Sequence, residues 1–429
     1  MDRISNLSDD LLLEIVSSLP TKKCSRHDAL VEKMEVSWTM LPKLDFDYCS
    51  ELEPPEYGKF IKYMDRSMVL NRAPVLQTLK FKVGRCSSFE DFATWIRIGM
   101  AREVRELEIS DRLEKGYIHT RSSIILPNSL YTYEKLEVLK LAYVVVDDVP
   151  ADHCFPSLKI LHLVYVTYES ATDESHRMLL SGCPVLEELV LDTCERFGLP
   201  PFSVEMPSLQ RLSILDTCDS VCGQRIDHKV VINAPSLKYL NFIDLNGELC
   251  LSGNMPEVVE ANVSIVHDCP EELLECLASV KRLFLCLAEP VLQHRIEFYH
   301  LLHLELCGGY VGWWDLLTWM LESSPKLQVL KLCSCDEHSA VPIEGHWSGP
   351  SSVPEGLMSH LHTFKWEDYC LNDEEKKIVA YILKNARELM TAAISVCSVK
   401  DYSKKKRSRK HKELASLPRA SSSCQLILK

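Results

Sequence analysis

A spaced apolar pattern constrains the fold of this chain more than any other feature of its sequence. In each copy, one apolar residue is followed by a second three positions later and by a third two positions after that, as in Leu136, Leu139 and Leu141. Twelve copies occur, with starting positions about 21 to 34 residues apart. The copies begin at Leu76, Val104, Leu136, Leu158, Leu186, Leu209, Leu237, Val258, Val280, Leu301, Leu327 and Leu361.

The spacing within one copy predicts a β-strand. Alternate side chains of a strand face opposite sides, so the second and third apolar residues enter the same core. One such strand cannot bury its apolar face alone, but stacked parallel neighbours can. Regular recurrence argues against unrelated amphipathic strands, so the predicted fold is α/β: a leucine-rich-repeat solenoid of parallel strands with convex helices or loops. Seven copies share a leading proline: Pro74, Pro156, Pro184, Pro207, Pro235, Pro256 and Pro325.

Three segments between copies have helical apolar spacing. They are residues 172–182, 271–277 and 313–321, which we expect on the convex side.

Charge and cysteine usage narrow the class of protein. The net charge of −13 over 429 residues disfavours nucleic acid as a partner, because phosphate binding needs a basic face. No apolar run approaches the ~20 residues that cross a bilayer. The first twenty residues carry five charges and lack a secretory apolar core, so the 18 cysteines read as buried free thiols. We expect a soluble intracellular protein, cytoplasmic and/or nuclear.

Residues 8–20 predict an amphipathic helix that needs a partner helix. Ser8 suits the N-cap and Pro20 ends the helix. Residues 2–22 resemble the opening of an F-box, although Ser8 stands where the family usually has proline. The resemblance implies binding to the adaptor subunit of an SCF-type cullin–RING ubiquitin ligase, and through it to a cullin. The implied adaptor contacts are Leu7, Leu12, Ile15, Leu19 and Pro20.

The C-terminal region resembles the FBD module of plant F-box proteins. Residues 372–386 match its helix and residues 414–428 its short strand, while residues 41–47 resemble the segment that joins F-box to repeats. The whole chain thus resembles the plant F-box/FBD/LRR-repeat family. The implied organisation is an F-box-like segment at 1–48, degenerate after residue 23, a solenoid at 70–366, and an overlapping FBD-like module at 359–429.

The second half of the F-box-like segment departs from the family. Residues 24–37 are polar where the family has a helix with a sequence like Leu-Ser-Lys-Arg-Trp. We interpret this as a local frame shift. Met34 is encoded by ATG and the Glu35 codon begins with G, so the frame displaced by one nucleotide reads TGG, tryptophan. With allowed codons, residues 29–38 spell Leu-Leu-Ser-Lys-Arg-Trp-Lys-Phe-Leu in that frame.

Reactive or metal-binding constellations are weakly supported. Cys333, Cys335 and His338 lack the paired C-x₂-C spacing of zinc sites. His153-Cys154 and His267-Asp268-Cys269 are Cys/His neighbours in sequence, but directly adjacent side chains on an extended chain point apart, which disfavours a cysteine hydrolase. We therefore expect no catalytic residues, no metal and no cofactor.

Residues 404–412 form the one strong basic cluster. It could act as a nuclear localisation signal. We expect a solvated loop between the FBD helix and the last strand.

The leading prediction is a non-enzymatic substrate receptor that binds an unknown protein target on the concave face of its repeats. Mixed charges at outward strand positions suggest a polar protein, with no nucleic acid or membrane partner. The predicted target contacts are Lys80, Glu108, Lys140, His162, Glu188, Arg211, Tyr239, Asn241, Arg282, His303, Glu305 and Lys331.

Three alternatives remain. The first is a repeat protein uncoupled from the ligase by its incomplete F-box. The second is a small-molecule receptor, and the third is an enzyme built on the Cys/His pairs.

Overall fold

The computed structural model describes part of the chain in two compact units, Met1–Glu195 (unit 1) and Arg196–Lys429 (unit 2). Each unit is considered by itself. The described residues are 39–47, 54–83, 89–111, 122–123, 126–146, 149–150, 153–168, 174–192, 202–216, 228–244, 249–268, 271–289, 296–308, 312–334, 346–396 and 404–429.

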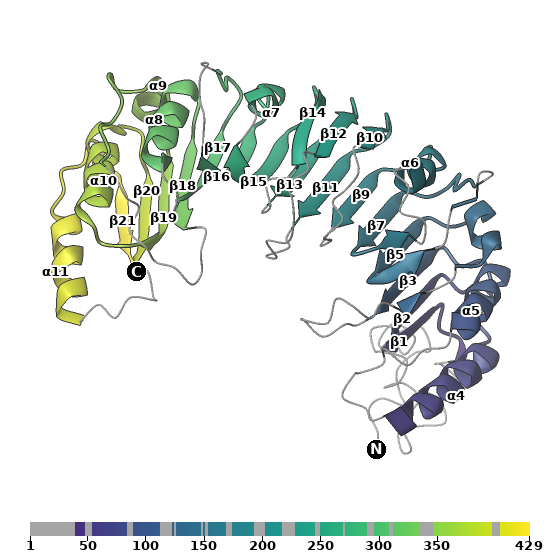
Figure 1. Ribbon diagram of the computed structural model, residues 1–429. Helices are drawn as coiled ribbons and strands as arrows, with labels where there is room; N and C mark the ends of the chain where they lie inside the picture. The colour runs from purple at the N-terminus through teal and green to yellow at the C-terminus, as the bar shows by residue number, and fades with distance from the viewer. Residues whose placement is uncertain are drawn as a thin grey trace. The chain divides into compact units, whose positions relative to one another are not determined.

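Unit 1 contains a parallel sheet whose strands follow chain order (Figure 1). They are β1 (Lys43–Asp47), β2 (Thr78–Val83), β3 (Glu106–Asp111), β5 (Val138–Ala142), β7 (Ile160–Val164) and β9 (Glu188–Asp192). The connections carry α4 (Pro54–Leu70), α5 (Phe89–Ala101), the 3₁₀ helix η1 (Asn128–Thr132) and α6 (Glu174–Ser181). Some connections add a second short ladder of β4 (Ser122–Ser123), β6 (Val144–Val146) and β8 (Thr167–Tyr168).

The repeated aliphatic residues form in-register rows in the core of unit 1. Leu107 pairs with Leu79 on one side and with Leu139 on the other. All three side chains are at most 1% exposed, and burial of each stabilises the fold by about 1.5–3 kcal/mol. Helix α5 covers the adjacent buried row, in which Phe81 pairs with Ile109, since Trp95 stacks on Phe81 with ring centroids 5.8 Å apart.

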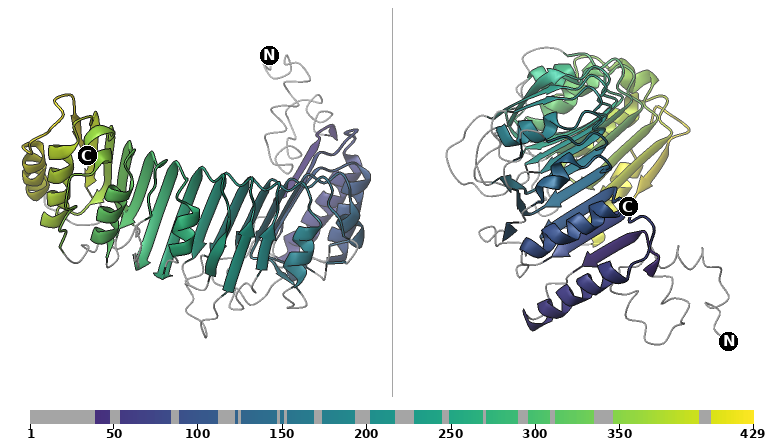
Figure 2. Two further views of the ribbon diagram at one scale, coloured as in Figure 1. Left: turned by 90° about the horizontal axis from the view of Figure 1, so that it is seen from above. Right: turned by 90° about the vertical axis from the view of Figure 1, so that its right-hand side faces the viewer.

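Unit 2 repeats the arrangement with more strands. Its sheet consists of β11 (Arg211–Asp216), β13 (Tyr239–Asp244), β15 (Glu260–Asp268), β16 (Arg282–Glu289), β17 (His303–Gly308), β18 (Val329–Ser334), β19 (Thr363–Tyr369), β20 (Thr391–Val396) and β21 (Gln425–Leu428). A second ladder contains β10 (Phe202–Glu205), β12 (His228–Asn233) and β14 (Leu249–Asn254). The helices are α7 (Glu271–Cys276), α8 (Trp313–Ser323), α9 (Glu355–Ser359), α10 (Asp373–Asn385) and α11 (Lys404–Ala415). Within each unit the strands stand side by side in both views of Figure 2.

The predicted fold class is confirmed. Each of the twelve apolar copies carries one strand, and neighbouring copies pair in parallel within each unit. The three predicted connecting helices correspond to α6, α7 and α8, and the two predicted C-terminal elements to α10 and β21. The sequence did not predict the second ladders, and it assigned β1 to a joining segment although β1 pairs with β2 along its whole length.

Residues 404–412 are helical, so the expected loop was wrong. The segment belongs to α11, which ends at Ala415 and buries Leu414 in its last turn. Two ion pairs hold α11 against α10: Lys376 Nζ lies 3.0 Å from Glu413 Oε2, and Lys410 Nζ lies 3.3 Å from Asp373 Oδ1. Lys and Arg are good helix formers, and this docking provides the tertiary support that an isolated twelve-residue helix lacks.

A capping box fixes the start of α10. The Asn372 side chain accepts a hydrogen bond from the Glu375 backbone N–H at 2.7 Å. The buried Glu375 carboxylate in turn accepts from the backbone N–H groups of Cys370, at 2.8 Å, and Asn372, at 3.4 Å. The reciprocal bonds satisfy donors that the first helical turn leaves unpaired.

Replacing Asn372 with alanine is therefore expected to lower the free energy of unfolding by about 1 kcal/mol. Asn372→Ser is the matched control, because its hydroxyl still accepts the bond. Denaturant titration and amide hydrogen exchange at Glu375 measure the effect. Equal stabilities of the two variants would show that the cap does not contribute.

No helix within the described ranges has the length and apolar character needed to cross a membrane.

Candidate interaction surface

The predicted adaptor contacts lie outside the described residues. Leu7, Leu12, Ile15, Leu19 and Pro20 fall in residues 1–38, as does the atypical segment 24–37. Their role stays a prediction from the resemblance.

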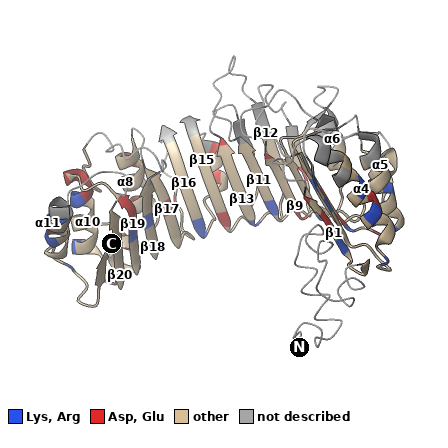
Figure 3. Ribbon diagram, turned by 90° about the horizontal axis from the view of Figure 1, so that it is seen from below, with Lys and Arg blue, Asp and Glu red and all other residues tan. Residues whose placement is uncertain are grey.

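The predicted target contacts lie on one face of each sheet. In the strands, side chains alternate between the buried aliphatic rows and the opposite face, which we call the open face of that unit. All twelve predicted contacts occupy open-face positions; Arg211 and Arg282 are exposed and the other ten are half-buried. Figure 3 marks the charged positions along the strands. Whether these residues bind a target stays a prediction.

Lys80 is the centre of a charged cluster on the open face of unit 1. Its Nζ lies 2.7 Å from Glu108 Oε2 and 3.1 Å from Glu106 Oε1, across the β2–β3 pairing. Thr78 Oγ1 donates a hydrogen bond to Glu106 Oε2 at 3.0 Å. The Lys80 side chain is 19% exposed, which leaves the cluster largely shielded from salt.

This geometry favours the charged forms of both Lys80 and Glu106. Burial alone would lower the pKa of Lys80, but the hydrogen bonds to Glu108 and Glu106 outweigh burial and raise it. Burial alone would raise the pKa of Glu106, yet the Lys80 bond and the Thr78 bond bring it below its ordinary value. The cluster is therefore satisfied internally.

Lys140 differs from Lys80 because it has no ion-pair partner among the described residues. It pairs in register with Glu108 on one side and with His162 on the other. His162 Nε2 instead contacts Glu188 Oε1 at 2.8 Å. Lys140 is thus one cation of the unit 1 open face that no ion pair among the described residues engages, although its charge contributes to lowering the pKa of Glu106.

A row of mixed character runs along the open face of unit 2. Arg211, Tyr239, Glu260, Arg282 and His303 follow one another in register on adjacent strands. Arg282 Nε lies 3.4 Å from Glu260 Oε2. Burial, assisted by the Arg282 charge, lowers the pKa of His303, which keeps its imidazole neutral at neutral pH.

The next row consists of Asn241, Asn262, Phe284, Glu305, Lys331 and Lys365. Lys331 Nζ lies 2.9 Å from both Glu305 Oε1 and Glu367 Oε2. Burial opposes the charged form of Lys331, but the two carboxylates prevail and raise its pKa.

Asn241 and Asn262, in this same row, have side-chain oxygens that could accept further hydrogen bonds. They pair in register on β13 and β15, and the side-chain oxygen of each is buried without a hydrogen-bond partner among the described residues. A buried acceptor without a donor is costly, so a ligand that supplies N–H or O–H donors would gain from meeting them.

Sequence reasoning missed Asn262 and Glu367 as members of this surface. Asn262 occupies the same alternate position as Asn241, so the strand pattern contained the signal. Glu367 lies where the β19–β20 register shifts after Trp366, and its pairing with Lys331 could not be read from spacing.

Three cysteines align beyond the polar rows of unit 2. Cys286, Cys307 and Cys333 occupy matching positions on β16, β17 and β18, and the first two are buried. Cys333 Sγ donates to Glu305 Oε1 at 3.7 Å. Cys335 and His338, the other two residues considered as zinc ligands, lie outside the described residues. Across the described ranges, no three His, Cys, Asp or Glu side chains are grouped so as to hold a metal ion.

The structure gives His153 and Cys154 different surroundings. His153 Nδ1 lies 2.8 Å from the Pro150 carbonyl oxygen, and its ring fills the space beside Gly182. Cys154 is exposed, whereas Cys183 is buried and its thiol donates to the Leu179 carbonyl at 3.3 Å. Burial, with a smaller contribution from Cys154, raises the pKa of Cys183 to about 12.

These surroundings predict a contrast in thiol reactivity. At about pH 8, iodoacetamide is expected to modify Cys154 at least about tenfold faster than Cys183, because the thiolate is the reacting species. Mass spectrometry of the alkylated peptides measures both rates, and denaturant should abolish the difference. Similar rates in the native protein would contradict the burial of Cys183.

Comparisons with known proteins cover nearly the whole chain. The family model for the LRR repeats of FBD-associated F-box protein At5g56370 matches residues 92–255, and the FBD model matches residues 349–394. Putative FBD-associated F-box protein At3g50710 of Arabidopsis thaliana is 60% identical, with 100% of both chains covered. Two further proteins of that plant are each 39% identical: F-box/FBD/LRR-repeat protein At5g56420, covering 99% of this chain and 98% of its own, and At4g26340, covering 100% of both.

Proposed function

Because this chain belongs to the F-box/FBD/LRR-repeat family of plant proteins, we propose that it is a substrate-recognition subunit of an SCF-type cullin–RING ubiquitin ligase. The F-box-like segment would bind the adaptor, and the repeats would hold a target protein near the ubiquitin-transferring enzyme. Such a receptor acts by proximity and needs no reactive side chain of its own.

One observation carries the target-binding half of the proposal. The strands of each unit present rows of polar side chains on the open face, in register, opposite the buried aliphatic rows. Most charges there pair with one another, while Lys140 and the oxygens of Asn241 and Asn262 have unused capacity. Taken by itself, the open face of unit 1 favours a target carboxylate that meets Lys140, and the open face of unit 2 favours hydrogen-bond donors that meet the two asparagines.

A competing function rests on the polar segment 24–37, which replaces the apolar helix expected there. With that helix lost, the chain would be a repeat protein that binds its target without reaching the ligase. Sequencing the transcript tests the cause: codons unable to spell the family helix in the displaced frame would exclude a frame shift.

A binding assay with the purified adaptor subunit separates the two functions. The full chain and Glu14→Ala, which alters the polar side of the helix predicted for residues 8–20, are expected to bind alike. Leu12→Asp should weaken binding at least about tenfold, because it places a charge within the apolar contact. Absence of binding by the unmodified chain at micromolar adaptor favours the uncoupled protein.

Affinity purification from the source tissue tests the target surface. Lys140→Glu is expected to lose proteins that the unmodified chain retains. Lys159→Glu is the matched control, since Lys159 is an exposed lysine of the same unit whose Nζ pairs with Glu137 outside the predicted contacts. Equal recovery by both variants would remove Lys140 from the binding surface.

A further inference from the structure

Helix α11 concentrates positive charge on an acidic protein. Its twelve residues include seven Lys or Arg and a single acidic residue, Glu413, whereas the whole chain carries a net charge of −13. One serine, Ser408, stands inside the basic run. Four cationic residues precede it directly: Lys404, Lys405, Lys406 and Arg407.

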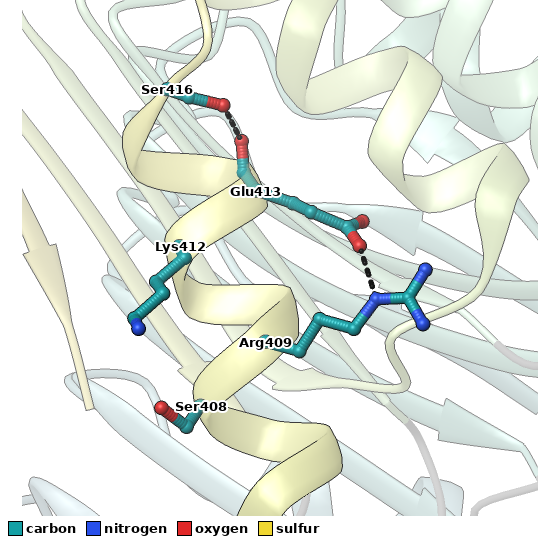
Figure 4. Close-up of a pocket in the computed structure, with 5 residues that line it drawn as sticks. All are labelled: Ser408, Arg409, Lys412, Glu413 and Ser416. Carbon is teal, nitrogen blue, oxygen red and sulfur yellow. Dashed lines mark hydrogen bonds and ion pairs between the residues drawn. The ribbon is translucent and has the colours of Figure 1, made fainter.

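The structure distinguishes Ser408 from Ser416, which directly follows α11. Both line a shallow pocket with Arg409, Lys412 and Glu413 (Figure 4). Ser416 Oγ donates to the Glu413 backbone carbonyl at 2.8 Å. Ser408 is exposed, its hydroxyl has no hydrogen-bond partner among the described residues, and it points to the same side of the helix as Lys412.

The cations around Ser408 are only partly engaged. Arg409 Nε bonds Glu413 Oε1 at 3.1 Å, and Glu413 is also held by Lys376 of α10 at 3.0 Å. Lys412 makes no ion pair with any described residue. A negative group at Ser408 would therefore meet an available ammonium four residues along the helix.

We propose that Ser408 is a phosphorylation site for a protein kinase that selects basic residues on the N-terminal side of its target serine. Charge complementarity between a kinase groove and its substrate is a recognised source of such selectivity. The Ser408 oxygen attacks the γ-phosphorus of a nucleoside triphosphate, and the bond from that phosphorus to the β–γ bridging oxygen breaks. The nucleoside diphosphate leaves, and the hydroxyl proton passes to a base on the kinase.

The anchoring of α11 is compatible with access by a kinase. Among residues 408–415 of α11, Leu414 is buried, and the side chains of 408–413 are exposed or half-buried. Residues 408–413 can thus open locally without exposing core, because none of their side chains is buried.

The helix also stabilises the product. A phosphoserine carries about −1.5 to −2 charges near neutral pH. At Ser408 it lies four residues before Lys412, whose ammonium can pair with it. Glu413 keeps Lys376 as a partner even if Arg409 turns to the phosphate, so α11 stays docked on α10.

Treatment of the full chain with ATP and a kinase that prefers basic substrates tests the site. Peptide mass spectrometry should find at least about tenfold more phosphate on Ser408 than on Ser416, the matched serine preceded by Lys412, Glu413, Leu414 and Ala415. Ser408→Ala should abolish that signal, while Ser416→Ala should leave it unchanged. Equal labelling of both serines, or none on Ser408, would overturn the proposal.

Phosphorus NMR of the phosphorylated chain tests the local pairing. The second pKa of a phosphoserine is ordinarily about 6, and Lys412 should lower it. Lys412→Gln should raise it toward the ordinary value, whereas Lys384→Gln on α10, outside the pocket, should leave it unchanged. An unchanged pKa in Lys412→Gln would refute the assigned ion pair.

Discussion

Replacing Leu304 with alanine is expected to lower the free energy of unfolding of unit 2 by about 2–5 kcal/mol. Leu304 is 0% exposed in β17 and lies in register between Leu283 and Leu330. Close packing on both sides limits collapse of the resulting cavity. The loss of stability therefore includes both the lost burial of apolar area and the free-energy cost of the cavity. Guanidinium titration of the full chain measures the shift.

The adjacent residue provides the control for this prediction. Glu305 lies on the open face of the same strand with its side chain 22% exposed. Glu305→Ala should cost less than about 1 kcal/mol, because Lys331 keeps Glu367 as a partner. A cost for Glu305→Ala equal to that for Leu304→Ala would contradict the assignment of the two faces.

Reversing the charge of Lys80 is expected to destabilise unit 1 by about 2 kcal/mol near neutral pH. Lys80→Glu would place a third carboxylate against Glu106 and Glu108, which now share the lysine. Like charges at this separation repel, and each raises the pKa of the others. Lys80→Arg retains the cation and serves as the control.

The pH dependence of this variant has a definite sign. The raised folded-state pKa values mean that the penalty is full at neutral pH and disappears below about pH 4, where carboxylates are protonated in both states. Urea titrations at the two pH values should therefore show the gap from the unmodified protein closing on acidification. A gap that stays constant would indicate lost packing instead of charge repulsion.

The unmodified cluster behaves in the opposite way. The lowered pKa of Glu106 contributes stability above the unfolded pKa of about 4.3, which is lost as the pH falls through the lowered value. The raised pKa of Lys80 contributes below the unfolded pKa of about 10.4, which is lost as the pH rises through the raised value. The pair is most stabilising between those limits.

Elements beyond the twelve copies show where sequence patterns were insufficient. Strand β14 pairs with β12 through Gly253, where a Cβ would lie 1.9 Å from the Ile232 carbonyl oxygen. Neither strand has the repeated spacing, so its existence depends on the neighbour that supplies its hydrogen bonds. Helix α11 likewise depends on its ion pairs with α10, which the charged sequence of α11 does not by itself predict.

The sequence alone determined which residues form the buried rows. Side chains alternate between the two faces of a strand, so the apolar positions within each copy identify the side chains that face inward. The neighbours on the open face were decided by tertiary structure. Lys80 meets Glu108 across 28 residues of chain, and Lys331 meets Glu367 beside a register shift. Such pairs depend on how separate strands align, and the packing of the stacked strands sets that alignment. Residue spacing therefore predicts which face a side chain occupies, but not which side chains it contacts there.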